Sequence, residues 1–134
     1  MRKLTLLLII TANCAVFAQT NPAITGWLIN TTGITGRHYV TGNPTPFVDA
    51  VQANVQLVQY NTTYAYVSAT GIPSYITGPF PGNPSIATAQ NKIFRIPLNP
   101  VQGTGTVATT GGNIGVFKNG VALFDYRDGV AWNN

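Results

Sequence analysis

Glycine and proline recur so often after residue 18 that few stretches are long enough to form a helix. The 134-residue chain holds 14 glycines and 9 prolines. Proline removes a backbone donor, and glycine weakens a helix interior. β-branched and aromatic residues, which favour strands, fill the intervals, and the absence of glutamate disfavours long amphipathic helices with ion-paired faces. The sequence therefore predicts an all-β fold, a single antiparallel β-rich domain built as a sheet or a sandwich, and it leaves the topology open.

Alternation of apolar and polar residues gives the most distinct strand signal. From 51 to 57, valine, alanine and leucine alternate with glutamine and asparagine, a pattern typical of a strand that is buried on one face. Segment 24–30 is also predicted to be a strand, with Trp27 as an anchor in the core. Three further segments rich in β-branched and aromatic residues are predicted to be strands: 37–41, 63–69 and 92–98.

Two short connections predict β-hairpins. The first is 60–62, between two of the predicted strands. The second is Asn119-Gly120, which lies between the apolar runs 114–117 and 121–124. Asparagine and glycine tolerate the positive φ values of a type I′ turn, so this turn type is expected there.

Two longer segments are predicted to be loops. Segment 71–91 is rich in proline, which cannot continue the hydrogen bonds of a sheet. Its Tyr75 and Phe80 can pack the loop against the domain or contact a ligand, and packing is favoured. Segment 103–112 is rich in glycine and threonine and is interpreted as a flexible connection.

Residues 1–18 match the three-part pattern of a secretory signal peptide. A basic start, Arg2-Lys3, precedes an apolar run at 4–12 that is too short to cross a bilayer. Small residues near position 18 fit a cleavage site before Gln19. We therefore expect a secreted protein, extracellular or periplasmic, with no membrane span in the mature chain. An uncleaved anchor and a buried strand are the alternatives.

Removal of the signal peptide would take away Cys14, the only cysteine, and two of the seven basic residues. A lipid anchor on Cys14 is disfavoured because Asn13 stands where a small residue is needed. Without a disulfide, the domain at 19–134 depends on packing, a metal or a partner for its stability. Five basic residues would remain against three acidic ones, with no basic stripe, so nucleic acid is not an expected partner.

His38 is the only histidine, and a protein metal site needs several ligands within reach. The sequence therefore predicts no metal site and no cofactor, and it places His38 at a strand edge between Arg37 and Tyr39. The serines have only this histidine as a possible base, so no Ser/His/Asp set can be assembled. Whether the chain is an enzyme is left open. The serines considered are Ser68, Ser74 and Ser85.

Asp125 and Asp128 stand three residues apart near the end of the chain. Calcium loops gather carboxylates at such spacing, but the further acids of an EF-hand are missing. A turn in which Asp128-Gly129 are turn residues and Arg127 pairs locally explains the same residues and is favoured. A hydrolase that uses the two carboxylates is the least favoured alternative.

Three tyrosines, Tyr60, Tyr64 and Tyr66, can form an aromatic row across the hairpin around 60–62. Such a row either stabilises a sheet by cross-strand contacts or binds sugars and other polymers by stacking. Sheet stabilisation is the commoner use and is favoured. The binding interpretation makes these tyrosines, together with Asp125 and Asp128, candidates for a binding site in an extracellular carbohydrate- or polymer-binding β-module.

Four motifs together resemble the upstream part of secreted bacterial YHYH-domain proteins. The motifs are Ala-Thr-Gly-Ile-Pro-Ser-Tyr at 69–75, Gly-Pro-Phe-Pro-Gly-Asn-Pro at 78–84, a Gln-Asn-Lys-Ile-Phe-Arg-Ile-Pro run within 90–100, and Ile-Gly-Val-Phe-Lys-Asn-Gly-Val-Ala-Leu-Phe-Asp at 114–125. The Tyr-His-Tyr-His motif that names the family does not occur in the sequence.

The resemblance implies a secreted or cell-envelope protein of undefined biochemical activity. In such proteins the histidine-rich motif suggests metal or anion handling, because paired imidazoles are common ligands. No site residue carries over to this chain, which corresponds to the scaffold that precedes the motif. We therefore expect a C-terminally truncated chain whose partner is the downstream half of the same polypeptide.

Overall fold

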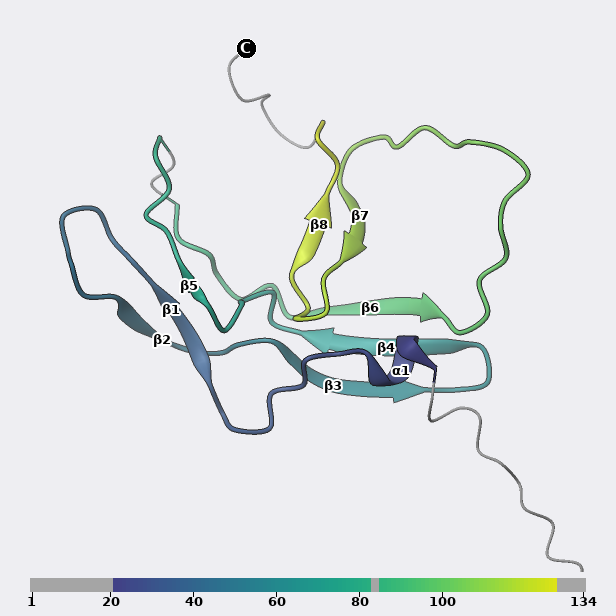
Figure 1. The fold of residues 1–134 in the computed structure, drawn as a ribbon, viewed down its shortest axis with the longest axis horizontal. Coiled ribbons are helices and arrows are strands. Elements are labelled where there is room, and N and C mark those ends of the chain that lie inside the picture. The colour runs from purple at the N-terminus through teal and green to yellow at the C-terminus, as the bar shows by residue number, and fades with distance from the viewer. Residues whose placement is uncertain (1–20, 83–84, 128–134) are drawn as a thin grey trace, which may run out of the picture.

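The computed structural model describes residues 21–82 and 85–127, which form eight strands and one short helix (Figure 1). The strands make a sheet of order β2-β1-β5, a sheet of order β3-β4-β6, and a two-stranded hairpin β7-β8. This arrangement confirms the predicted all-β fold. The elements are α1 Pro22–Thr25, β1 Thr35–His38, β2 Phe47–Gln52, β3 Val55–Tyr60, β4 Tyr64–Ala69, β5 Ile76–Thr77, β6 Lys92–Pro97, β7 Asn113–Val116 and β8 Ala122–Phe124.

The sheet β3-β4-β6 is antiparallel throughout and holds the core on one of its faces. Val58 pairs with Val67, which pairs in turn with Phe94, so these side chains lie on one face. In β4, every second residue from Ala65 to Ala69 is buried. The hairpin between β3 and β4 and the strand β6 confirm the predictions for 60–62 and 92–98.

The inner face of this sheet is covered by the N-terminal segment and by the tip of the β7-β8 hairpin. Trp27 packs against the core cluster that contains Val55 and Val67, and its indole Nε1 donates to the carbonyl of Ala23 over 2.7 Å. Gly120, at the hairpin tip, lies against Ala69 and Val55. Trp27 therefore packs beside the core as predicted, although it does not stand in a strand.

The predicted strand 24–30 is wrong, because its first part is a helical turn. The side chain of Asn21 accepts a hydrogen bond from the backbone N–H of Ala23 over 2.9 Å, and Pro22 occupies the first turn. Both features favour the start of a helix. Further along, Ile29 makes only an isolated parallel bridge to Val55.

The predicted single strand 51–57 is also wrong, because the chain turns at Asn54. This residue has a φ of 67°, in the left-handed region that asparagine tolerates better than most residues. Its backbone N–H donates to the carbonyl of Ile72 over 2.7 Å, and its side-chain oxygen accepts from the N–H of Ser74 over 3.2 Å. These bonds lie between the end of β2 and the start of β3, so the alternating segment 51–57 is divided between two different sheets.

The β7-β8 hairpin is confirmed, but its turn type differs from the prediction. The carbonyl of Phe117 accepts from the N–H of Gly120, and the N–H of Phe117 donates to the carbonyl of Val121, both over 2.8 Å. Gly120 has a φ of 79°, whereas Asn119 does not have a positive φ. This geometry is a type I turn followed by a left-handed glycine, so the type I′ expectation is wrong.

The predicted loop 71–91 contains one short strand. β5 pairs with β1 in parallel, with Arg37 opposite Ile76 and His38 opposite Thr77. It is the one parallel pair among the described strands, and it holds the start of the proline-rich segment beside β1. The peptide bond between Gly78 and Pro79 is cis.

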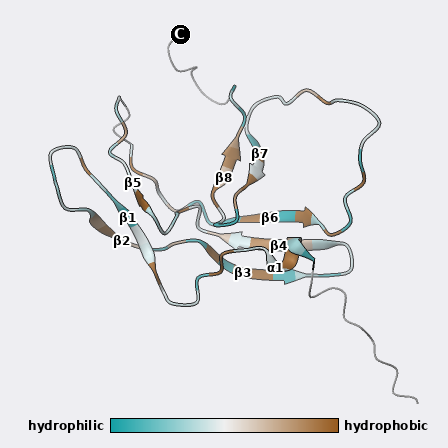
Figure 2. Cartoon of the chain, in the orientation of Figure 1, coloured by the Kyte–Doolittle hydropathy of each residue, from teal (hydrophilic) through white to brown (hydrophobic). Residues whose placement is uncertain are grey.

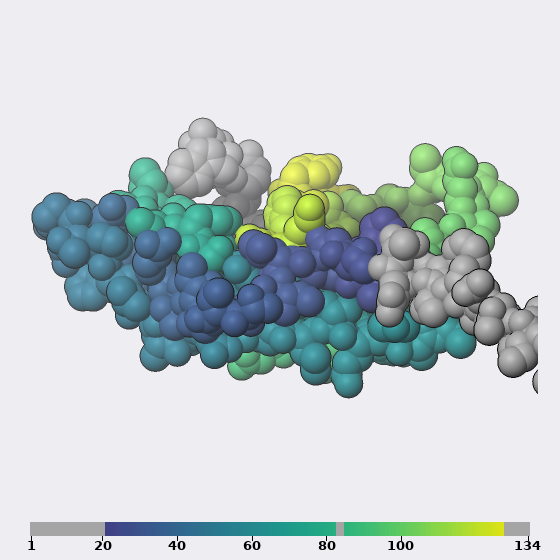
Figure 3. Space-filling view, turned by 60° about the horizontal axis from the view of Figure 1, so that its bottom comes forward, coloured from purple at the N-terminus to yellow at the C-terminus, as the bar shows by residue number. Residues whose placement is uncertain are grey.

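The core is small for the number of strands. Figure 2 shows hydrophobic residues gathered in β5 and β8, yet Ile76, Leu123 and Phe124 are each more than a third exposed. The connection between β6 and β7, drawn in green, stands away from the body in Figures 1 and 3, and Val101 and Val107 on it are 92% exposed. Over residues 21–82 and 85–127, the structure has no helix of the length and apolar character that a membrane span requires.

Candidate functional site

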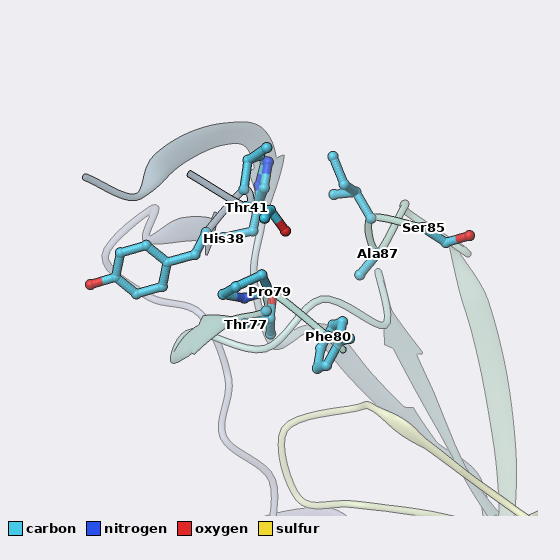
Figure 4. Close-up of a pocket in the computed structure, with 11 residues that line it drawn as sticks. His38, Thr41, Thr77, Pro79, Phe80, Ser85 and Ala87 are labelled. Atoms are coloured by element: carbon cyan, nitrogen blue, oxygen red, sulfur yellow. The ribbon is translucent and has the colours of Figure 1, made fainter. Parts of the chain in front are cut away.

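A cavity of about 250 Å³ opens where β1 meets the segment that follows β5 (Figure 4). His38 and Thr41 come from the end of β1 and the residues beyond it, while Thr77, Pro79 and Phe80 form the adjoining wall. Residues 85–87 line the opposite side. The walls are mostly apolar, with a few polar groups, as is common for small-molecule sites.

The imidazole of His38 is held on two sides by residues of β2. Nδ1 lies 2.8 Å from the Oδ1 of Asp49, and the ring stacks on Phe47 with 5.7 Å between the centroids. An ionised carboxylate can only accept hydrogen bonds, so the proton of this bond is on Nδ1. Nε2 has no hydrogen-bond partner among residues 21–82 and 85–127. The neutral ring therefore offers a lone pair at Nε2.

Gly36 makes room for this pair. It lies two residues before His38 on β1, at an irregularity in the β1-β2 register. A Cβ at this position would stand 2.6 Å from the Oδ2 of Asp49 and would overlap Ile72. The carboxylate therefore occupies space that any other residue at position 36 would fill.

Sequence reasoning missed this site because it treated His38 as an isolated residue. The segment 42–50 was not predicted to be a strand, so Asp49 was not placed opposite β1. Phe47 and Val48 at the start of this segment are β-formers, and recognising them as the first residues of β2 would have put Asp49 near the histidine.

The cavity does not assemble a Ser/His/Asp set. Ser85 lines the wall opposite His38, and Figure 4 shows its hydroxyl directed away from the imidazole. Within the described parts of the chain, no three histidine, cysteine or acidic residues are grouped closely enough to hold a metal ion.

Two of the predicted tyrosines lie together on the outer face of the β3-β4-β6 sheet. The rings of Tyr64 and Tyr66 are 6.4 Å apart and tilted by 60°, and the guanidinium of Arg95 lies 4.8 Å from the Tyr64 ring. Tyr60 pairs with the buried Ala65, so its side chain is on the inner face. The prediction of a row of three tyrosines is therefore wrong for Tyr60.

The tyrosine face, as we call this surface, is open to solvent. Leu57 is 49% exposed and Ile93 is 68% exposed, and Gln59 and Arg95 are also exposed. Tyr64 and Tyr66 are partly exposed between them. Its residues are Leu57, Gln59, Tyr64, Tyr66, Ser68, Ile93 and Arg95.

Asp125 is a buried residue in the turn after β8, where Tyr126 and Arg127 are exposed. Its carboxylate accepts from the backbone N–H of Arg127 over 3.0 Å and pairs with the guanidinium over 3.3 Å. Hydrogen bonding by the Thr109 side chain, followed by the bond from Arg127, lowers the pKa of Asp125 below its ordinary value. The local pairing of Arg127 agrees with the turn interpretation, and Asp128 lies outside the described residues.

Comparison with family models, with curated proteins and with solved structures found no match to this chain. The resemblance to YHYH-domain proteins therefore stays a prediction.

Proposed function

We propose that this chain is a secreted or cell-envelope β-module that binds a glycan or a similar polymer on its tyrosine face. The observation that carries this proposal is the group formed by Tyr64, Tyr66 and Arg95 on the solvent-exposed face of the β3-β4-β6 sheet.

The composition of the tyrosine face suits a carbohydrate. Aromatic rings offer large apolar surfaces with a polar edge, which complement the C–H faces and hydroxyls of a sugar. Gln59 and Arg95 lie opposite Tyr66 on the neighbouring strands and can bond to hydroxyl groups. An antiparallel sheet also presents these side chains at regular spacing along an extended surface, which suits a linear polymer.

The location in this proposal is supported by the sequence of residues 1–18, whose basic start, apolar run and small residues fit an export signal. The resemblance to YHYH-domain proteins points to the same compartment. In that setting the β-rich domain serves as a scaffold that anchors its polypeptide to a polymer, without a catalytic step of its own.

The test is retention of the full chain on a panel of insoluble polysaccharides. We expect wild-type protein to be retained on at least one of them. The double variant Tyr64→Ala plus Tyr66→Ala should lose at least about fivefold in affinity, because each stacked ring contributes roughly 0.5–1.5 kcal/mol.

Tyr126→Ala is the matched control, since Tyr126 is 87% exposed and lies outside the tyrosine face. It should bind like wild type. If no polysaccharide retains the wild-type protein, or if the double variant and the control bind equally well, the proposal is wrong.

A further inference from the structure

The cavity at His38 combines mostly apolar walls with an imidazole whose orientation is fixed by its neighbours. Pro79, Phe80 and Ile86 supply apolar surface, and His38 is held by Asp49 and Phe47 so that the ring cannot turn freely. Of the described residues that line it, none is aspartate, glutamate, lysine or arginine. A charged ligand would lose its hydration here without gaining an opposite charge at the wall.

We propose that this cavity, the His38 pocket, binds a small phenol whose hydroxyl donates a hydrogen bond to the Nε2 of His38. The proton on Nδ1 is fixed by Asp49, so Nε2 is an acceptor whenever the ring is neutral. The ligand ring would pack against Phe80 and Pro79, which lie on the same wall (Figure 4).

The size of the cavity agrees with this ligand class. An apolar cavity of about 150 Å³ accepts benzene, and the His38 pocket has about 250 Å³. It therefore accommodates one substituted aromatic ring with space to spare. Because the pocket belongs to the β2-β1-β5 sheet and the tyrosine face to the other sheet, this proposal and the proposed function can fail independently.

The experiment uses the fact that His38 is the only histidine. Its Cε1–H gives a single NMR signal, which reports binding beside the imidazole. We would titrate the full chain with 4-methylphenol at fixed pH and, separately, with toluene, which has the same ring and methyl group but no hydroxyl.

We expect a saturable shift of the His38 signal with 4-methylphenol and an affinity about tenfold weaker for toluene, the difference that one buried hydrogen bond makes. Phe80→Ala should weaken both ligands. Phe80 is half exposed, so this variant retains the fold. Asp49→Ala keeps the reporting histidine but frees the ring, and it should reduce the preference for the phenol.

Tyr126→Ala, at an exposed position outside both the His38 pocket and the tyrosine face, is the matched control and should bind both compounds like wild type. Equal affinity of wild type for the two compounds would overturn the proposal. The absence of any saturable shift, or unchanged binding by Phe80→Ala, would overturn it as well. The comparison of two ligands on wild-type protein does not depend on whether a variant folds.

Discussion

At the scale of single residues, the His38–Asp49 pair depends on the absence of a side chain at Gly36. Gly36→Ala would bring a Cβ within 2.6 Å of the Asp49 carboxylate and into overlap with Ile72. We expect a loss of about 1–3 kcal/mol in the free energy of unfolding, as is usual for overpacking. The His38 Cε1–H signal should also shift, because the carboxylate has to move.

The control for Gly36→Ala is Gly115→Ala. Gly115 is also a strand glycine, but the nearest atom to its added Cβ, on Leu123, is 3.6 Å away. Urea unfolding and the His38 signal should both stay close to those of wild type. A Gly36→Ala protein with an unchanged His38 signal would show that the carboxylate does not need this space.

The buried carboxylate of Asp125 makes stability depend on pH. Hydrogen bonds from Thr109 and Arg127 hold the pKa of Asp125 below its ordinary value in the folded chain, so its contribution to stability is complete above the ordinary pKa and is lost as the pH falls through the folded value. Wild type should lose stability between pH 5 and about pH 3, and Asp125→Asn should lose less over the same interval. Urea midpoints at the two pH values measure this, and equal losses in the two proteins would contradict it.

At the scale of elements, the β7-β8 hairpin contacts the core at Gly120. Gly120 has a φ of 79°, and a Cβ there would overlap that of Ala69 and lie 3.2 Å from Val55. Gly120→Ala should therefore lower the free energy of unfolding by more than the roughly 1–2 kcal/mol that a left-handed conformation alone costs a non-glycine residue. Gly42→Ala, with a φ of 84° and nothing within 4 Å, should cost only that conformational term. Thermal unfolding measures the loss of stability in the two variants. Equal losses would show that a Cβ at position 120 does not clash with the core.

The elements that sequence patterns predicted well are those whose pairing is local or whose alternation is regular. β4 and β6 alternate in burial from residue to residue, and the Asn119-Gly120 hairpin closes within a few residues. The failures lie where distant backbone groups decide the conformation. Asn54 turns the chain because it forms hydrogen bonds with Ile72 and Ser74. No local sequence pattern predicts these bonds.

The candidate sites divide in the same way. Alternation within one strand puts Tyr64 and Tyr66 on the same face, so they could be proposed together from the sequence. Asp49 reaches His38 only through the register between β1 and β2, which includes an irregularity at Gly36. Tyr60 was assigned to the wrong face because the register of β3 against β4 is shifted near Val55.

At the scale of the whole molecule, a few hydrogen bonds to backbone groups form part of the joint between the two three-stranded sheets. Asn54 bonds to Ile72 and Ser74, and the hydroxyl of Thr70 donates to the carbonyl of Gln52 over 2.8 Å. These residues are short links at the ends of β2 and β4 rather than packed strand faces. The stability of the sheet that carries the His38 pocket should therefore depend on this joint.

Asn54→Ala tests that dependence, because it removes the side-chain bond to Ser74 and puts alanine at a φ of 67°. We expect a loss of about 1–3 kcal/mol in the free energy of unfolding. The folded-state NMR signal of His38 should disappear at a lower urea concentration than the methyl signals of Val67. Asn54→Gly, which keeps the backbone conformation without strain, should lose only the side-chain bond. If both signals of Asn54→Ala still disappear at one urea concentration, the two sheets unfold as one cooperative unit, and the joint is not what couples the pocket to the core.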